Sequence, residues 1–182
     1  MSAPQSSHFS ESYERFSRLV EDQPLPCALV DLDAVDRNVE AITSALGGCK
    51  KKIRIATKSI RCPDLVRYVA AKLGAVSCGL MTYTASETAF WAREGFTDLL
   101  LAYPKMASRD AELLARVNQN GAVAAVVVDC EEHLVPLAAA ARAAETTIPV
   151  VVEIENRSIS LQLGDPVFFR HAKAGELAEH FN

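Results

Sequence analysis

The chain has 182 residues, of which 49% are hydrophobic and 23% are charged, the composition of a soluble globular protein with a substantial core. Disordered and collagen-like chains are excluded, and membrane spans are not expected because no window approaches 18 uninterrupted apolar residues. The formal net charge is −4, and the longest run of like charge is Lys50–Lys52. Nucleic acid is therefore not an expected partner, since phosphate binding needs a concentrated positive face.

The cysteines indicate a reducing compartment. They are odd in number, widely spaced and free of any C-x-x-C pair. The polar, serine-rich start of the chain lacks the apolar stretch of a secretory signal. A cytoplasmic location is therefore predicted. The five cysteines are Cys27, Cys49, Cys62, Cys78 and Cys130.

Apolar, strand-like runs recur along the chain, and their starts lie 22 to 26 residues apart. The segments between them have helical periodicity, so each repeat predicts one strand followed by one helix. The runs are Cys27–Val30, Ile53–Thr57, Ala75–Leu80, Asp98–Tyr103, Ala122–Val128 and Ile148–Ile154.

Boundary residues support this alternation of strands and helices. Capping residues, a first-turn proline and terminal glycines stand where helix starts and stops require them. Pro136 predicts a helix start or a kink within the last helix. The start signals are Asp33, Pro63, Thr84 with Glu87, Ser108, and Asp129 with Glu132; the stop signals are Gly47-Gly48, Gly74, Gly95 and Asn120-Gly121.

Strict alternation predicts an α/β fold with a parallel sheet covered by helices, either an open doubly wound sheet or a (β/α)8 barrel. Eight such units would need roughly 190 residues. Only 28 residues follow Ile154, and the rhythm breaks at about Glu155. An incomplete barrel is therefore expected if the fold is of the barrel type.

Lys58 ends the second apolar run. Alternation places Ile55 and Thr57 on one face of the strand, and Arg54 and Lys58 on the other. In a barrel, Lys58 would lie at the carboxyl end of its strand, where this architecture carries catalytic groups. A neutral lysine amine there forms a Schiff base with a carbonyl compound, and cations such as Arg54 or Arg61 would favour the neutral form. The alternative is a lysine that merely extends into solvent from a strand end.

Four segments together resemble the alanine racemase N-terminal-domain superfamily, and most closely its D-threonine-aldolase-like branch, the amino acid deaminase/aldolase proteins. The resemblance implies that pyridoxal 5′-phosphate (PLP) binds to Lys58 and that Ser59 is the hydroxyl residue of the same motif. The four segments are Ala28–Asp33, Ile53–Ser59, Cys78–Glu87 and Val151–Glu155.

The resemblance also predicts the organisation of the chain. Residues 1–23 form an N-terminal arm, residues 24–155 a partial PLP-binding (β/α)8 TIM-type barrel, and residues 156–182 a remnant of the family's C-terminal β domain. Family members are about twice as long, so the chain is expected to be internally truncated near Glu155. The tail reads His171-Ala172-Lys173 where the aldolases carry a zinc pair. Because lysine is a poor zinc ligand, no metal is expected.

Further residues are candidates for the site. Tyr103 ends a strand and either lines the barrel mouth or packs there. Glu153 and Glu155 alternate inward on an apolar strand and would need a cation such as Lys58 or Arg54. Arg54, Tyr103 and Glu153 therefore join Lys58 and Ser59 as predicted cofactor-binding residues, with Lys58 as the catalytic residue.

Other polar residues receive structural interpretations. Glu87 is interpreted as a helix cap and not as a catalytic acid. His8, His133 and His180 have no neighbours at ligand spacing and are interpreted as solvated surface residues.

The sequence thus predicts a PLP-dependent amino acid enzyme of the deaminase, aldolase or racemase type, whose small-molecule substrate is an amino acid. These three reactions begin alike, so the residues do not separate them. The alternative is a non-catalytic remnant that binds PLP or a partner protein. Because strands apolar on both faces would lose neighbours in an incomplete barrel, self-association is also expected.

Overall fold

The computed structural model describes residues 5–104 and 107–153. The chain divides into two compact units, Met1–Gly48 and Cys49–Asn182. The helices are α1 (Gln5–Val20), α2 (Leu32–Ala45), α3 (Pro63–Leu73), α4 (Ala85–Arg93), α5 (Ser108–Gln119) and α6 (Leu134–Ala143), with short 3₁₀ helices η1 (Gly74–Val76) and η2 (Glu131–His133). The strands are β1 (Ile53–Ala56), β2 (Ser77–Thr82), β3 (Asp98–Leu101), β4 (Val123–Val128) and β5 (Val150–Val152).

The first unit contains the helices α1 and α2 joined by an extended segment. The side chain of Asp31, not Asp33, caps α2 by accepting a hydrogen bond from the Ala34 amide at 3.2 Å. The strand predicted at Cys27–Val30 is wrong, because these residues have no strand conformation and are exposed. A strand needs a hydrogen-bonded neighbour, and no described strand pairs with this segment.

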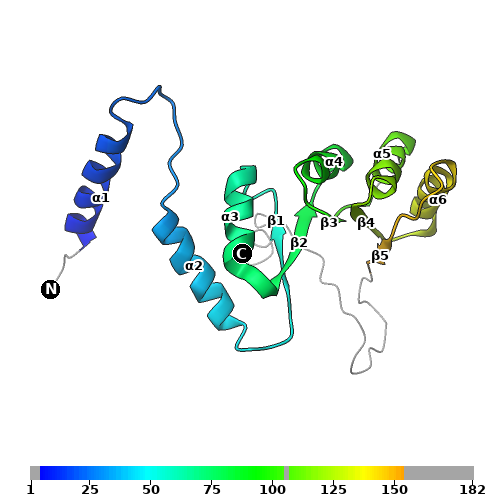
Figure 1. Ribbon diagram of the computed structural model, residues 1–182, viewed down its shortest axis with the longest axis horizontal. Coiled ribbons are helices and arrows are strands. Elements are labelled where there is room, and N and C mark those ends of the chain that lie inside the picture. The colour runs from blue at the N-terminus through cyan, green and yellow to red at the C-terminus, as the bar shows by residue number, and fades with distance from the viewer. Residues whose placement is uncertain (1–4, 105–106, 154–182) are drawn as a thin grey trace, which may run out of the picture. The chain divides into compact units, whose positions relative to one another are not determined.

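The second unit is a parallel sheet with the strand order β1-β2-β3-β4-β5. Because right-handed crossovers between consecutive neighbours place every helix on the same face, this order builds the wall of a barrel and not a doubly wound sheet. Figure 1 shows α4, α5 and α6 side by side along the sheet. The prediction of an incomplete (β/α) barrel is confirmed for the described residues.

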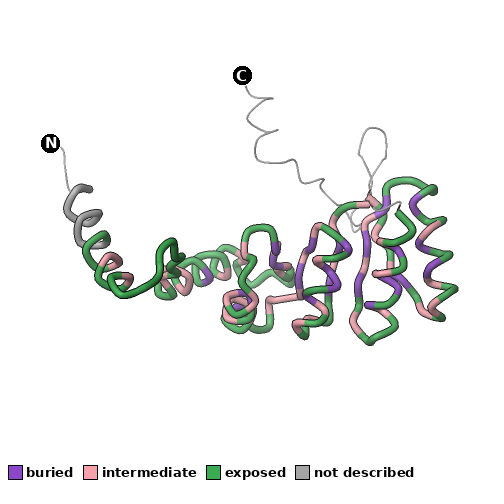
Figure 2. Tube along the Cα trace, turned by 90° about the horizontal axis from the view of Figure 1, so that it is seen from above, coloured by how far each residue is buried: buried purple, intermediate pink, exposed green. Residues whose placement is uncertain are grey.

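The two faces of this sheet differ in burial. Leu99, Leu101 and Val126 point toward the helices and are fully buried. Leu100 and Val127 point to the opposite face and are half-buried. Figure 2 shows this alternation of buried and intermediate residues along the strands. The open face corresponds to the interior of a barrel.

The helices pack on the sheet through an apolar layer whose largest member is Trp91. This side chain is 2% exposed. Its ring contacts Phe90 and Phe96 edge-on, with ring centroids 5.3 and 5.4 Å apart, the geometry that aromatic quadrupoles favour. Trp91 therefore belongs to the core of the second unit.

Two predicted helix starts are corrected, and one of the two alternatives given for Pro136 is confirmed. Ser108 is the first residue of α5 and its side chain makes no capping bond. Asp129 and Glu132 do not form a capping pair; η2 begins after Cys130, and Asp129 bonds to His133 instead. Pro136 lies in the first turn of α6, where its missing N–H costs nothing, so it marks a helix start and no kink.

The amino edge of the sheet is held by a set of polar contacts. Arg54 bonds to both carboxylate oxygens of Asp98, at 2.8 and 3.2 Å, and to the Leu80 and Asp98 carbonyls at 3.3 Å. The backbone approaches closely here because Gly79 has φ +87° and stands in an irregularity of the β1–β2 register. A Cβ at Gly79 would lie 2.1 Å from the Asp98 carbonyl oxygen.

Within the described residues, no helix combines the length and the apolar character needed to cross a membrane.

Candidate active site

The carboxyl ends of the parallel strands all lie at one edge of the sheet. Six residues that follow the strands at this edge have side chains suited to catalysis or ligand binding. They are Lys58 after β1, Tyr83 after β2, Tyr103 after β3, Asp129 and Cys130 after β4, and Glu153 after β5. In barrel folds this edge carries the active site.

Lys58 stands in a tight turn directly after β1. The Ser59 amide donates to the Ala56 carbonyl and the Ile60 amide donates to the Thr57 carbonyl, both at 3.2 Å. These two bonds fix the backbone on either side of the lysine. Its side chain is exposed, and Nζ lies 5.0 Å from the centroid of the Tyr83 ring, within the range of a cation–π contact. No acidic side chain among the described residues forms an ion pair with it.

Glu87 ties the ends of β1 and β2 to the start of α4. Its carboxylate accepts hydrogen bonds from the Thr57 hydroxyl at 2.5 Å and from the Tyr83 amide at 2.9 Å. Its own amide donates to the hydroxyl of Thr84, the residue that caps α4, at 3.1 Å. The predicted capping bond between Thr84 and Glu87 is confirmed, and the Glu87 carboxylate additionally positions Thr57, the residue before Lys58, and the amide of Tyr83.

Tyr83 and Tyr103 form an aromatic pair beside Lys58. Their ring centroids are 5.5 Å apart and the rings are tilted by 48°. The Tyr83 hydroxyl is buried and has no hydrogen-bond partner within the part of the chain that the structure describes. Burial raises the pKa of Tyr83 above its usual value, and the nearby Tyr103 and Glu87 raise it further. Sequence reasoning missed Tyr83, although it follows β2 as Lys58 follows β1.

The other predicted residues lie at different places. Ser59 is exposed in the turn beside Lys58. Arg54 lies at the amino end of β1 with Asp98 as its partner, so the structure does not bring it next to Lys58. Glu153 follows β5 at the carboxyl edge, with its amide bonded to the Val128 carbonyl at 2.8 Å. Glu155 lies outside the described residues.

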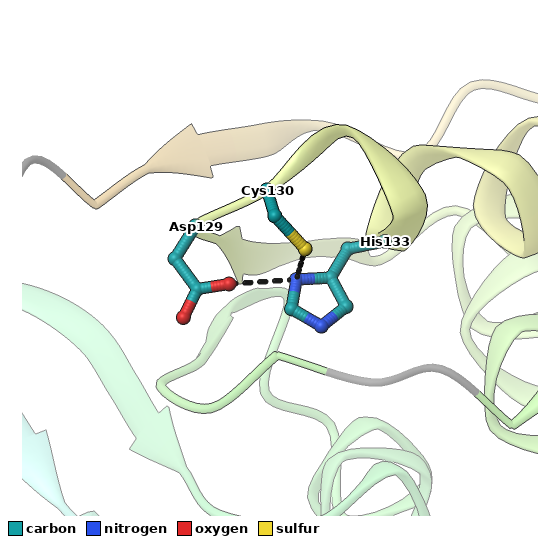
Figure 3. Close-up of side chains that lie close together, drawn as sticks. All are labelled: Asp129, Cys130 and His133. Atoms are coloured by element: carbon teal, nitrogen blue, oxygen red, sulfur yellow. Dashed lines mark hydrogen bonds and ion pairs between the residues drawn. The ribbon is translucent and has the colours of Figure 1, made fainter.

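A second group of side chains lies at the carboxyl end of β4. His133 Nδ1 is 2.8 Å from an oxygen of Asp129 and 3.3 Å from the sulfur of Cys130, as Figure 3 shows. His133 is 9% exposed, so its interpretation as a solvated surface residue is wrong. In the sequence, Asp129 and Cys130 precede His133 by four and three residues, and this spacing could have indicated that the three side chains meet.

Electrostatics at this group involve a fourth residue. A hydrogen bond to the Glu132 carboxylate raises the pKa of the Cys130 thiol above its usual value, and burial contributes in the same direction. The pKa of Glu132 is lowered, first by its own backbone N–H and then by the Cys130 thiol.

Sequential parallel strands with helices along one face define part of a (β/α) barrel, and Lys58 lies in the turn after β1. In such barrels the active site lies at the carboxyl edge of the strands. Residues 30–164 match the family model of the alanine racemase N-terminal domain. The chain belongs to this family.

One relative is a 3-hydroxy-D-aspartate aldolase from Paracoccus denitrificans (strain Pd 1222), which is 30% identical over 130 residues. The match covers 71% of this chain and 33% of that protein. The chain therefore spans about a third of the length of this curated relative.

Solved structures show the same partial correspondence. The D-threonine aldolase from Filomicrobium marinum is 28% identical with a TM-score of 0.64, over 74% of this chain and 36% of that one. The D-threo-3-hydroxyaspartate dehydratase from Delftia sp. HT23 is 21% identical with a TM-score of 0.63, over 72% of this chain and 34% of that one. The second likeness concerns the fold alone.

Proposed function

We propose that this chain carries the cofactor lysine of a PLP-dependent amino acid enzyme and that Lys58 is this lysine. In the proposed linkage, the Lys58 amine forms a Schiff base with the cofactor aldehyde, and one water molecule is released. Because relatives are named for 3-hydroxy-D-aspartate and D-threonine, we take a D-amino acid with a β-hydroxyl group as the substrate class. Aldol cleavage is then the reaction to test first, ahead of deamination and racemisation.

The position of Lys58 carries the proposal. Its amine is exposed at the carboxyl edge and makes no ion pair with a described residue, while its ring neighbour Tyr83 has an unpartnered buried hydroxyl. An available primary amine beside a hydrogen-bond donor suits a cofactor that has an aldehyde and several acceptor oxygens. The residues present therefore fit PLP.

The chain's own residues have separate tasks in this proposal. Bound PLP would supply an electron sink for negative charge at the substrate Cα. Lys58 would hold the cofactor, and the Tyr83 hydroxyl would donate a hydrogen bond to an acceptor oxygen of the cofactor. Glu87 would act as a positioning residue, because it anchors Thr57, the residue before Lys58, and the amide of Tyr83, which follows the neighbouring strand. Ser59, Tyr103 and Glu153 stay predicted cofactor contacts at the same edge.

Reductive labelling tests the lysine assignment. The chain is incubated with PLP, reduced with borohydride, digested and mapped by mass spectrometry. We expect the modified lysine to be Lys58 and the label to disappear in Lys58→Ala. The matched control is Lys51→Ala, at an exposed lysine before β1, which should label as the wild type does. Labelling of Lys58→Ala to the wild-type extent would refute the assignment.

The second candidate function is a protein that binds PLP or a partner without turnover. One observation favours it: β1 and β5 are edges of the described sheet, and no described strand closes the barrel between them. Loss of positioning groups costs orders of magnitude in rate. We expect little or no turnover of D-amino acids by the 182-residue chain; robust aldolase, deaminase or racemase activity would reject this candidate.

We also propose that the chain self-associates and works in the cytoplasm. The β4–β5 register places Val150 and Val152 on the face of the buried Val126 and Val128, yet they are 42% and 55% exposed. Exposed apolar strand edges favour pairing with another chain. Sedimentation should show concentration-dependent association that a Val150→Thr/Val152→Thr variant reduces. A wild type that stays monomeric over the same concentrations would contradict the proposal.

A further inference from the structure

The segment after β4 places three different metal-ligating side chains around one point. Asp129 and Cys130 directly follow the strand, and His133 ends the single turn η2. One ligand atom from each residue lies within 4.8 Å of the other two. Figure 3 shows the carboxylate and the sulfur converging on the same ring nitrogen, with the other nitrogen directed away.

The donor set and its spacing suit a transition-metal ion. Zinc binds carboxylate oxygen, thiolate sulfur and imidazole nitrogen at about 2.0 to 2.3 Å, which places tetrahedral ligands about 3.3 to 3.8 Å apart. Here the nitrogen is 2.8 Å from the oxygen of Asp129 and 3.3 Å from the sulfur of Cys130. Small side-chain shifts therefore suffice to bring all three donors to bonding distance.

The surroundings hold the donors in place. The strand β4 ends on the buried Val128, and His133 is itself 9% exposed. Asp129 and Cys130 are exposed, so an ion has access from solvent. Three ligands within five consecutive residues also lower the entropy lost when the site closes.

We propose that Asp129, Cys130 and His133 bind one divalent transition-metal ion of the zinc type, with a fourth position open to water or another ligand. On binding, the metal–sulfur bond replaces the thiol S–H bond of Cys130 and one proton goes to solvent. The imidazole binds through Nδ1 and carries its proton on Nε2.

This site is separate from the lysine site and from the tail pair considered in the sequence analysis. Three strand spacings separate the ends of β1 and β4, on the order of 14 Å along the sheet. The sequence prediction of no metal rested partly on the tail, which lies outside the described residues. It also rested on the absence of ligand-spaced neighbours of His133, which the structure corrects. Metal binding by these three residues does not depend on PLP, so the two proposals can be tested separately.

Cobalt titration of the metal-free 182-residue chain, without PLP, tests the proposal. We expect one equivalent of Co²⁺ to bind with a thiolate-to-cobalt charge-transfer band, and Zn²⁺ to displace it. Cys130→Ser should remove the band and weaken binding by more than the 10- to 100-fold that loss of an outer contact costs. The Tm of the wild type should rise with Zn²⁺ because the ion binds the folded state.

Two further variants complete the test. Cys62→Ser changes another exposed cysteine and should bind cobalt as the wild type does. His133→Ala should also lose the ion, and circular dichroism shows whether that variant is folded. Because Cys130 is exposed, Cys130→Ser should stay folded. This variant therefore tests metal binding even if His133→Ala unfolds. Absence of cobalt binding, absence of a thiolate band, or equal binding by Cys130→Ser would overturn the proposal.

Discussion

The two edges of the parallel sheet use polar residues in opposite ways. At the amino edge, Arg54 satisfies Asp98 with two hydrogen bonds and also bonds to two backbone carbonyls. At the carboxyl edge, Lys58 has an aromatic neighbour but no described acidic partner. The Tyr83 hydroxyl is buried there without a hydrogen-bond partner among the described residues. The charges of the amino edge are therefore paired, while the carboxyl edge keeps Lys58 and the Tyr83 hydroxyl without described polar partners beside the bonded Glu87.

This difference between the two edges indicates which polar residues the fold requires and which are available for function. Charged groups that are fully paired contribute to stability and have little left to offer a ligand. Unpartnered polar groups cost free energy in the folded state and are retained at functional sites. Variants at the two edges should therefore separate stability from cofactor binding.

The largest expected effect is on the amino edge, at Gly79. Gly79→Ala combines a positive φ with a Cβ that would lie 2.1 Å from a backbone oxygen, so unfolding free energy should fall by about 2 to 6 kcal/mol. Gly121→Ala is the matched control, since Gly121 has φ +91° and nothing within 4 Å of an added Cβ. It should lose only about 1 to 3 kcal/mol. Equal losses in urea denaturation would show that the close approach of the strands has no energetic consequence.

A smaller loss is expected at Glu87. Glu87→Ala leaves the Thr57 hydroxyl without its carboxylate partner and the Tyr83 amide without an acceptor, which should cost about 1 to 3 kcal/mol. Glu87→Gln keeps one acceptor oxygen and should lose less. Glu112→Ala, at an exposed position of α5, serves as the control for thermal denaturation. A Glu87→Ala variant as stable as Glu112→Ala would contradict the role given to this carboxylate.

Much of this architecture follows from the sequence, and the exceptions have physical causes. Apolar runs and terminal glycines predict the five parallel strands because they depend on local periodicity. The strand predicted at Cys27–Val30 is wrong because a strand also needs a hydrogen-bonded neighbour, and the local sequence pattern gives no information about neighbours. Tyr83 was missed because its role depends on Lys58 and Tyr103, which the fold brings near it. His133 was missed although its neighbours Asp129 and Cys130 are close to it in the sequence.

Asp98→Asn should have a still smaller effect on stability. The Arg54 side chain is 26% exposed and that of Asp98 is 50% exposed, so loss of the ion pair should cost about 1 kcal/mol or less. Added salt should lower the stability of the wild type more than that of the variant, because screening weakens only an existing pair. PLP labelling of Lys58 should be unchanged. A loss of labelling would mean that the amino edge also supports the cofactor.

The smallest effect concerns pH at Tyr83. Its pKa is raised in the folded state, so the unfolded chain loses this proton first as the pH rises. The contribution to stability is therefore complete below pH of about 10 and declines above it. Tyr83→Phe should remove this part of the alkaline decline in denaturation experiments, whereas Tyr13→Phe, at an exposed position of α1, should not. If the stability of Tyr83→Phe declined at alkaline pH as much as that of the wild type, ionisation of Tyr83 would not contribute to the decline.

The visible absorption spectrum of the chain mixed with PLP tests most directly whether the carboxyl edge is the functional one. Lys58 is an exposed amine at that edge. We predict a Schiff-base absorption band that borohydride removes, present in the wild type and in Lys51→Arg and absent in Lys58→Arg. An undiminished band in Lys58→Arg, with the variant folded by circular dichroism, would contradict the central claim.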